Sequence, residues 1–268
     1  MTLAAVIQMN STSQEESNWR QAKDLIVRAA GRGAQLVATP ENTNFLGPHQ
    51  EKVQRAETLE GETCARFSNL AQELSIHLLL GSFNEKSDDV ERCLNTSVLF
   101  GPDGGQLAVY RKIHLFDVDV SAQVRFSESA TVEAGSELVT AATDLGVMGL
   151  TICYDVRFPW VYQELRARGA EILTVPSAFT LTTGKDHWHP LLRARAIETQ
   201  CYVLAPAQWG QHDDEGLRES FGHAMIVDPW GQVVAMAADG PGVALAEIDL
   251  RRLERVRSAM PVIDHRRD

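Results

Sequence analysis

The sequence predicts an α/β fold, a layered sandwich in which helices cover a mixed sheet. Two observations predict it: strand-like and helix-like segments alternate along the chain, and hairpin turns join several neighbouring strands. Because both halves of the chain show this pattern, a core built from two sheets fits it. A single core stops growing at roughly 250–300 residues, so we expect one domain over residues 1–268.

In the first half of the chain, apolar runs and helical spacing define the expected elements. Trp19, Ala22, Leu25 and Ala29 recur at helical spacing, and glycines a few residues later offer a stop. The sequence "GPDGG" predicts a hairpin turn between two strands. We expect strands over residues 3–9, 35–41, 76–83, 94–101 and 105–112, and helices over residues 18–34 and 63–75.

In the second half, a proline constrains the position of one helix. A proline cannot donate the hydrogen bond of a helix interior, so Pro190 predicts a helix that begins close to it, over residues 186–200. The basic tail over residues 251–268 contrasts with the acidic whole and can reach over another surface. We expect two strands within residues 137–153, two within 222–238, single strands over 170–179, 201–208 and 242–250, and a helix over 158–169.

The charge balance argues against a nucleic-acid-binding protein. The chain has 25 Lys and Arg against 36 Asp and Glu, a net charge of −11 and a pI of about 5.2. No apolar run approaches the ~18 residues of a membrane-spanning helix, and the N-terminus lacks the positive region of a signal peptide, so we expect a cytoplasmic protein. The four cysteines form no C-x-x-C pair, which favours free thiols.

Three reactive side chains share one kind of position, because each ends a strand-like segment. They are Glu41, Lys112 and Cys153. Ligands of open α/β sheets collect outside the carboxyl ends of strands, so these residues can converge on one cleft. Taken singly, each has an ordinary alternative: Cys153 as a small core residue, Glu41 as a solvated carboxylate and Lys112 as a surface lysine.

Together the three residues could carry out acyl transfer to a thiol. A free cysteine titrates near ~8.5, so Cys153 needs a base or a nearby cation. Glu41 could accept the thiol proton and return it to a leaving amine. Lys112 could stabilise an oxyanion, with the backbone N–H of Tyr154 as a second donor.

Other motifs are weaker. There is no G-x-S-x-G, P-loop or G-x-G-x-x-G sequence. A Cys–His dyad would need His114, His187 or His223, for which polar roles in helices or turns suit equally well. His187 and His189 could suggest a metal, but no third ligand has suitable spacing, so we expect none.

The motifs around these residues resemble those of a known family. "PEN" contains Glu41, "YRKIHLFDVD" contains Lys112 and "ICYDVRFP" contains Cys153. In this order they resemble the Glu–Lys–Cys motifs of the nitrilase (carbon–nitrogen hydrolase) superfamily, and the resemblance covers the whole chain. Segments 175–212 and 221–231 and the ending "MPVIDHRR" are similar to the Nit branch, which is described as acting on deaminated glutathione.

The resemblance implies a four-layer α-β-β-α sandwich, no cofactor, and homodimers or larger homo-oligomers. It implies that Glu41 is the general base, Lys112 the oxyanion cation and Cys153 the nucleophile. Glu128 matches the second glutamate of the superfamily and would position Lys112 and the substrate. Without the resemblance, Glu128 would be interpreted as a solvated loop acid.

The resemblance also implies substrate-binding residues. Phe179 and Thr183 would line the pocket, and Tyr154 would contact the substrate through its backbone N–H. Arg157 is suited to bind a substrate carboxylate, with a structural ion pair as its alternative. Phe179 could equally be a core aromatic. Segment 120–129, "VSAQVRFSES", departs from the Pro-Gly-Gly-rich form of the family, so the shape of that pocket wall is open.

The sequence therefore predicts a thiol amidase. True nitrilases usually carry tryptophan and glutamate after the nucleophile, whereas here Tyr154 and Asp155 follow it, which favours amides over nitriles. Deaminated glutathione is the expected substrate. The alternatives are an ω-amidase acting on 2-oxoglutaramate, another small-amide or N-carbamoyl hydrolase, and a catalytically silent binding subunit.

Overall fold

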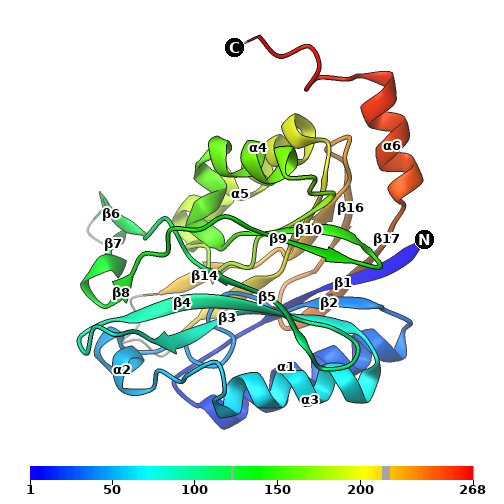
Figure 1. Cartoon of the computed structure of the whole chain (residues 1–268). Helices are drawn as coiled ribbons and strands as arrows, with labels where there is room; N and C mark the ends of the chain where they lie inside the picture. Colours follow the sequence, from blue (N-terminus) through cyan, green and yellow to red (C-terminus); the bar gives the residue numbers. More distant parts are fainter. Residues whose placement is uncertain (122–123, 213–217, 268) are drawn as a thin grey trace.

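The chain forms four layers, helix–sheet–sheet–helix, with the two sheets face to face (Figure 1). The structure is a computed structural model that describes residues 1–121, 124–212 and 218–267. Helices α1 and α3 cover the outer face of one sheet, and α4 and α5 cover the outer face of the other. The four-layer α-β-β-α sandwich expected from the sequence is confirmed.

The larger sheet contains nine strands within the described residues, and a separate hairpin lies beside it. Seven of its strands are hydrogen-bonded side by side in the order β14-β13-β1-β2-β3-β4-β5. In addition, β17 pairs with β1 and β8 pairs with β4. These strands are β1 (Thr2–Met9), β2 (Leu36–Ala38), β3 (His77–Lys86), β4 (Cys93–Phe100), β5 (Gln106–Arg111), β8 (Val132–Glu133), β13 (Ala207–Gln211), β14 (Glu219–Phe221) and β17 (Gly242–Ile248); the hairpin is β6 (Asp117–Ser121) and β7 (Val124–Ser127).

The smaller sheet contains six strands within the described residues, in the order β16-β15-β12-β11-β10-β9. They are β9 (Val139–Thr143), β10 (Gly146–Leu150), β11 (Ile172–Thr174), β12 (Tyr202–Ala205), β15 (Met225–Val227) and β16 (Val233–Met236). The helices are α1 (Glu15–Gly31), α2 (His49–Gln54), α3 (Glu62–Leu74), α4 (Pro159–Ala167), α5 (Leu181–Thr199) and α6 (Leu250–Ala259).

Burial on both faces explains the apolar run at the centre of β1. On β1, Ala4 and Val6 point into the core between the sheets, whereas Ala5 and Ile7 point toward α1 and α3. Successive side chains of a strand face opposite sides, so both sets of positions must be apolar. Each fully buried large aliphatic side chain stabilises the fold by about 1.5–3 kcal/mol.

Two helices differ from the sequence expectation. Residues 251–268 were expected only as a basic tail, but α6 forms there because Leu253 and Val256 bury one face and the Asp249 side chain caps its start. Helix α5 begins at Leu181, five residues earlier than expected, so Pro190 lies inside it and the expected first-turn position was wrong. Pro190 is exposed, and water can therefore bind the carbonyl that it leaves without a donor.

Among the helices of the described segments, none has the length and apolar character needed to traverse a bilayer.

The interior proline gives a stability prediction. Replacing Pro190 with alanine supplies the missing N–H donor on an exposed helix face, so Pro190→Ala should stabilise the protein by about 1 kcal/mol. Thermal unfolding should show a Tm about 2–4 °C higher. Thr182→Ala, an exposed change in the same helix, is the control and should shift stability by less than about 0.5 kcal/mol. An unchanged or lower Tm for Pro190→Ala would show that the neighbouring structure requires the proline.

Candidate active site

Side chains that follow strands of both sheets meet at one cavity. Glu41 and Lys112 follow strands β2 and β5 of the larger sheet, and Cys153 follows β10 of the smaller sheet. The strands end one to three residues earlier than expected, at Ala38, Arg111 and Leu150. The cavity is lined by Glu41, Asn42, Lys52, Lys112, Phe116, Phe126, Glu128, Cys153, Tyr154, Ala178, Phe179, Thr180, Thr183, Arg218, Glu219 and Ser220.

The carboxylate of Glu41 is buried and held at both oxygens. Its Oε1 accepts hydrogen bonds from Lys112 Nζ at 2.8 Å and from Asn95 Nδ2 at 2.9 Å. Its Oε2 accepts a hydrogen bond from the backbone N–H of Ala178 at 2.8 Å. Because Ala178 follows β11 of the smaller sheet, this last bond crosses from one sheet to the other.

A glycine of β3 allows the segment that carries Glu41 to pass close by. Gly81 lies against the carbonyl groups of Thr39 and Pro40, and a Cβ at this position would overlap both oxygens. Its own N–H donates to Thr39 Oγ1 at 3.0 Å. The close approach therefore fixes the backbone immediately before Glu41.

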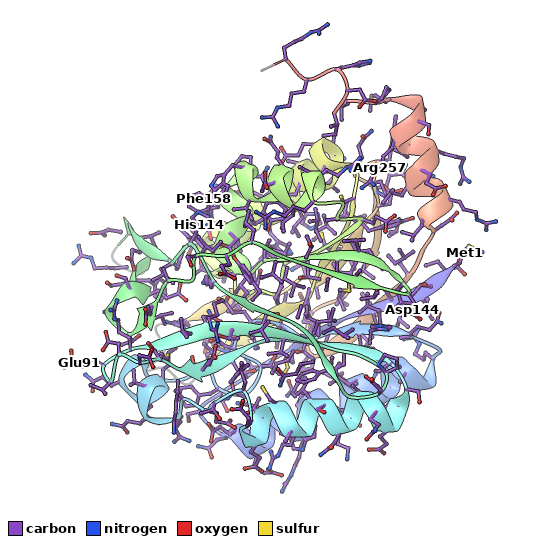
Figure 2. All side chains as sticks on the ribbon, viewed as in Figure 1. Met1, Glu91, His114, Asp144, Phe158 and Arg257 are labelled. Carbon is purple, nitrogen blue, oxygen red and sulfur yellow. The ribbon has the colours of Figure 1, made fainter. Side chains whose placement is uncertain are left out.

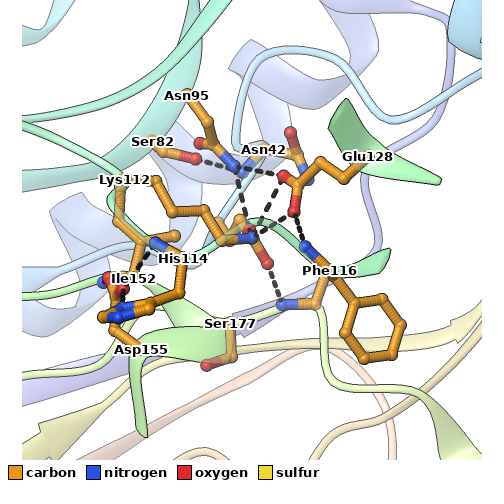
Figure 3. A network of polar contacts seen from close by, with 12 residues as sticks. Asn42, Ser82, Asn95, Lys112, His114, Phe116, Glu128, Ile152, Asp155 and Ser177 are labelled. Atoms are coloured by element: carbon orange, nitrogen blue, oxygen red, sulfur yellow. Dashed lines mark hydrogen bonds and ion pairs between the residues drawn. The ribbon is translucent and has the colours of Figure 1, made fainter. Parts of the chain in front are cut away.

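The ammonium of Lys112 lies between two carboxylates (Figure 3). Besides Glu41, it binds Glu128 Oε2 at 2.8 Å and Oε1 at 3.0 Å. Burial alone would lower the pKa of Lys112, but the charges of Glu128 and Glu41 outweigh it and raise that pKa well above its usual value. Lys112 therefore carries a permanent positive charge beside the thiol of Cys153.

Glu128 is positioned by the chain as well as by Lys112. It begins a short 3₁₀ helix, Glu128–Ala130, and its Oε2 accepts the backbone N–H of Phe116 at 2.7 Å. Burial would raise its pKa, but the charges of Lys112 and Lys52 and its hydrogen bonds lower the pKa of Glu128 to about 2. The sequence alternative of a solvated loop acid is wrong, since Glu128 is buried.

Asn95 joins the two carboxylates and was not identified from the sequence. Its Nδ2 lies 2.9 Å from Glu41 Oε1 and 3.3 Å from Glu128 Oε1. Its backbone carbonyl also accepts the N–H of Lys112 at 2.9 Å. The only signal in the sequence was a run of polar residues, "NTS", in a strand that otherwise reads as buried.

Cys153 is presented by a strained turn rather than by a strand. It begins the 3₁₀ helix Cys153–Arg157 and has a φ of +47°, in the left-handed region that non-glycine residues rarely adopt. Its N–H donates to the carbonyl of Pro176 at 3.0 Å. Burial and the negative charge of Glu41 raise the pKa of Cys153 well above its usual value, so the sulfur rests as a thiol.

Asp155 holds this turn in place. Its Oδ2 accepts the N–H of Ile152 at 2.9 Å, and its Oδ1 accepts the N–H of His114 at 3.1 Å (Figure 3). Its Oδ2 also accepts the hydroxyl of Tyr110 at 2.6 Å. His114 also stacks on Phe158, with 3.6 Å between ring centroids, and the two lie side by side in Figure 2. Because Tyr110 belongs to β5, Asp155 ties the cysteine turn to the larger sheet.

The predicted substrate-binding residues divide into two groups. Tyr154, Phe179 and Thr183 line the cavity. Arg157 is not among the lining residues: its guanidinium lies over the rings of Tyr154 and Phe179, and its Nη1 is 3.3 Å from His187 Nδ1. Two other cations line the cavity, Lys52 and Arg218, and neither was identified from the sequence.

The alternative chemistries find no support in this geometry. Of the candidate dyad histidines, His114 contacts Asp155 and His223 contacts the carbonyl of Phe221, and no described histidine lines the cavity with Cys153. Within the described residues, no three His, Cys, Asp or Glu side chains are grouped to hold a metal. In segment 120–129, residues 122–123 lie outside the described residues, so the expected change in wall shape is not described there.

A buried thiol beside a carboxylate and a fixed ammonium is suited to acyl transfer. The carboxylate can move a proton, the sulfur can attack a carbonyl carbon, and the ammonium can stabilise negative charge on its oxygen. The burial of Glu41, Lys112 and Cys153 strengthens each of these electrostatic effects.

The chain is similar in sequence and fold to members of one hydrolase family. Residues 3–258 match the carbon–nitrogen hydrolase family. The chain is 46% identical to a deaminated glutathione amidase of Synechocystis sp., over 98% of this chain and 97% of that protein, and 43% identical to the Homo sapiens one, over 100% and 83%. The crystal structure of C. elegans NitFhit has a TM-score of 0.93 at 42% identity and covers 99% of this chain and 65% of that protein.

Gly81 provides a test of how the fold places Glu41. In Gly81→Ala the new methyl group must push the Thr39–Pro40 backbone away, which should destabilise the protein by about 2 kcal/mol. Because small displacements of reacting groups are costly, kcat should fall at least about tenfold for any amide substrate. Tm and kcat are measured together. Gly31→Ala, where a Cβ meets no atom within 4 Å, is the matched control; wild-type kcat in Gly81→Ala would contradict the placement.

Proposed function

The chain belongs to the carbon–nitrogen hydrolase family, and from that premise we propose that it hydrolyses deaminated glutathione to 2-oxoglutarate and cysteinylglycine. As a family member it is a hydrolase that acts on amides. The observation that carries the proposal is the cluster of Glu41, Lys112 and Cys153 in one buried cavity, in a chain 43–46% identical to proteins named deaminated glutathione amidase.

In the proposed first half-reaction, Glu41 takes the proton of the Cys153 thiol as the sulfur attacks the amide carbonyl carbon. The ammonium of Lys112 and a backbone N–H stabilise the oxyanion. The carbon–nitrogen bond then breaks, Glu41 returns the proton to the leaving nitrogen, and cysteinylglycine departs. The raised pKa of Cys153 supports this order, because a resting thiol needs a base at the moment of attack.

In the second half-reaction, water hydrolyses the thioester on Cys153. Glu41 takes one proton from the water as its oxygen attacks the thioester carbonyl, and Lys112 again stabilises the oxyanion. The carbon–sulfur bond breaks, the thiolate recovers the proton from Glu41, and 2-oxoglutarate is released. Glu128 holds Lys112 in position throughout, which its two hydrogen bonds to the ammonium support.

The substrate is proposed to lie against Tyr154, Phe179 and Thr183, which line the cavity. Arg157 is proposed to support this wall from behind, because its guanidinium stacks on two of the wall's rings.

We also propose that residues 1–268 form one carbon–nitrogen hydrolase domain in a cytoplasmic homo-oligomer. The family match over residues 3–258 supports the single domain. All four cysteines are free thiols, which suits a reducing compartment. Val234 and Met236 on the edge strand β16, and Trp230 just before it, have exposed apolar side chains. These side chains support a contact between two copies of the chain.

The substrate is tested by incubating the pure enzyme with deaminated glutathione. We expect release of 2-oxoglutarate and cysteinylglycine in equal amounts, and after brief mixing an intact-mass increase equal to a 2-oxoglutaryl group on a peptide that contains Cys153. Cys153→Ala should keep the wild-type Tm and lose all turnover. If deaminated glutathione yields no products while 2-oxoglutaramate is hydrolysed well, the enzyme is an ω-amidase instead. A Cys153→Ala variant with normal turnover would refute the thioester mechanism.

Glu128 provides a test of the negative charge that faces Lys112. In Glu128→Gln the side chain keeps its shape but loses the charge that faces Lys112, so kcat should fall about 10²-fold while KM changes little. Because the pKa of Glu128 is about 2, the loss should be the same at every pH from about 5 to about 9.

Acid unfolding gives a separate readout of Glu128. Its folded-state pKa lies below the usual value of 4.5, so its stabilising effect is fully present above that pH and is lost as pH falls toward about 2. Urea unfolding should show that the stability gap between wild type and Glu128→Gln narrows between about pH 5 and about pH 3. A gap that widens on acidification would contradict the ion pair.

A further inference from the structure

Lys52 is a buried cation that the proposed chemistry does not use. It lies on α2, is 2% exposed, and lines the same cavity as Cys153. Within the described residues its ammonium makes no hydrogen bond and no ion pair, although its charge acts on Glu128 at longer range. Lys112, which is equally buried, is instead bound by two carboxylates.

An ammonium in this state is costly for the folded protein. Burial removes its hydration, and without a bound acceptor nothing nearby replaces it. Burial and the positive charge of Arg218 lower the pKa of Lys52 to about 8, despite the opposing effect of Glu128. A group kept at such a cost inside a ligand cavity is suited to bind an anion.

The surroundings of Lys52 favour a carboxylate at the far end of the acyl group. Arg218, just before β14, brings a second cation to the cavity, and its guanidinium lies over the ring of Phe126. Glu41 and Glu128 are already paired with Lys112, and Glu219, the remaining lining carboxylate, is exposed. The rings of Phe116 and Phe126 offer apolar surface for methylene groups between the thioester and the anion.

We propose that Lys52, assisted by Arg218, binds the free carboxylate of the substrate's 2-oxo acid portion and makes the enzyme selective for acidic acyl groups. This inference rests on the proposed function. The acyl portion stays on Cys153 after the amine departs. Because the ammonium of Lys52 is buried in the cavity, the anion that pairs with it belongs to this portion of the substrate. A neutral acyl group would leave the ammonium desolvated and unpaired, and the site therefore rejects it.

Two amides that differ only at the far end test the proposal. Glutaramate carries a terminal carboxylate, and pentanamide carries a methyl group in its place. Wild type should prefer glutaramate, and Lys52→Met should lower its kcat/KM for glutaramate and for deaminated glutathione about 10- to 100-fold, mainly through KM. Pentanamide hydrolysis should stay within about twofold. Lys185→Met, at an exposed lysine of α5 that does not line the cavity, should leave both substrates unchanged.

Folding is checked by Tm, which should not fall in Lys52→Met because an unpaired buried charge is removed. Lys52→Gln serves as a second variant with the same expected selectivity loss. Equal losses for both amides would overturn the proposal, since Lys52 would then support the reacting groups instead. Unchanged kinetics would overturn it as well.

A further substrate identifies which carboxylate is bound. Deaminated glutathione with its C-terminal glycine amidated should remain sensitive to Lys52→Met; if it does not, Lys52 binds the peptide carboxylate and the proposal is wrong. The proposed function fails separately: if deaminated glutathione is not cleaved but glutaramate is preferred through Lys52, the physiological substrate is wrong and the carboxylate site stands.

Discussion

The ammonium of Lys112, buried between Glu41 and Glu128, is the interaction on which the rest of the site depends. Two buried carboxylates offer more acceptor positions than one ammonium can fill, so they need further hydrogen-bond donors. Asn95 and the backbone N–H groups of Phe116 and Ala178 supply them. These donors come from a strand of the larger sheet and from loops after β5 and β11, so the charge cluster requires the complete fold around it.

Much of this arrangement could be predicted from the sequence. Alternating strands and helices predict the layers, because each element must bury an apolar face. Glu41, Lys112 and Cys153 could be selected because each closes an apolar segment, and the structure brings them to one cavity. The family resemblance added Glu128, which nothing in its loop distinguishes from a solvated acid.

The rest depends on tertiary contacts that local patterns do not report. Helix α5 tolerates Pro190 because that residue faces solvent. Which face of the helix is exposed depends on tertiary packing, and helix propensity does not report it. Asn95 and Lys52 resemble ordinary polar residues in sequence, and only their burial in the folded chain distinguishes them. Arg157, four residues after Cys153, does not line the cavity; its guanidinium lies over the rings of Tyr154 and Phe179, and its expected role in substrate binding stays a prediction.

The division of the site between the two sheets affects how the protein loses its activity. The proton-transfer and charge-stabilising groups belong to one sheet and the sulfur to the other, joined by Glu41–Ala178 and Tyr110–Asp155 hydrogen bonds. Any loosening between the sheets separates these groups while each sheet keeps its own ladder. Catalytic activity therefore depends on the contact between the two sheets. On heating, activity would be lost before secondary structure. Neither half of the chain holds a working catalyst by itself.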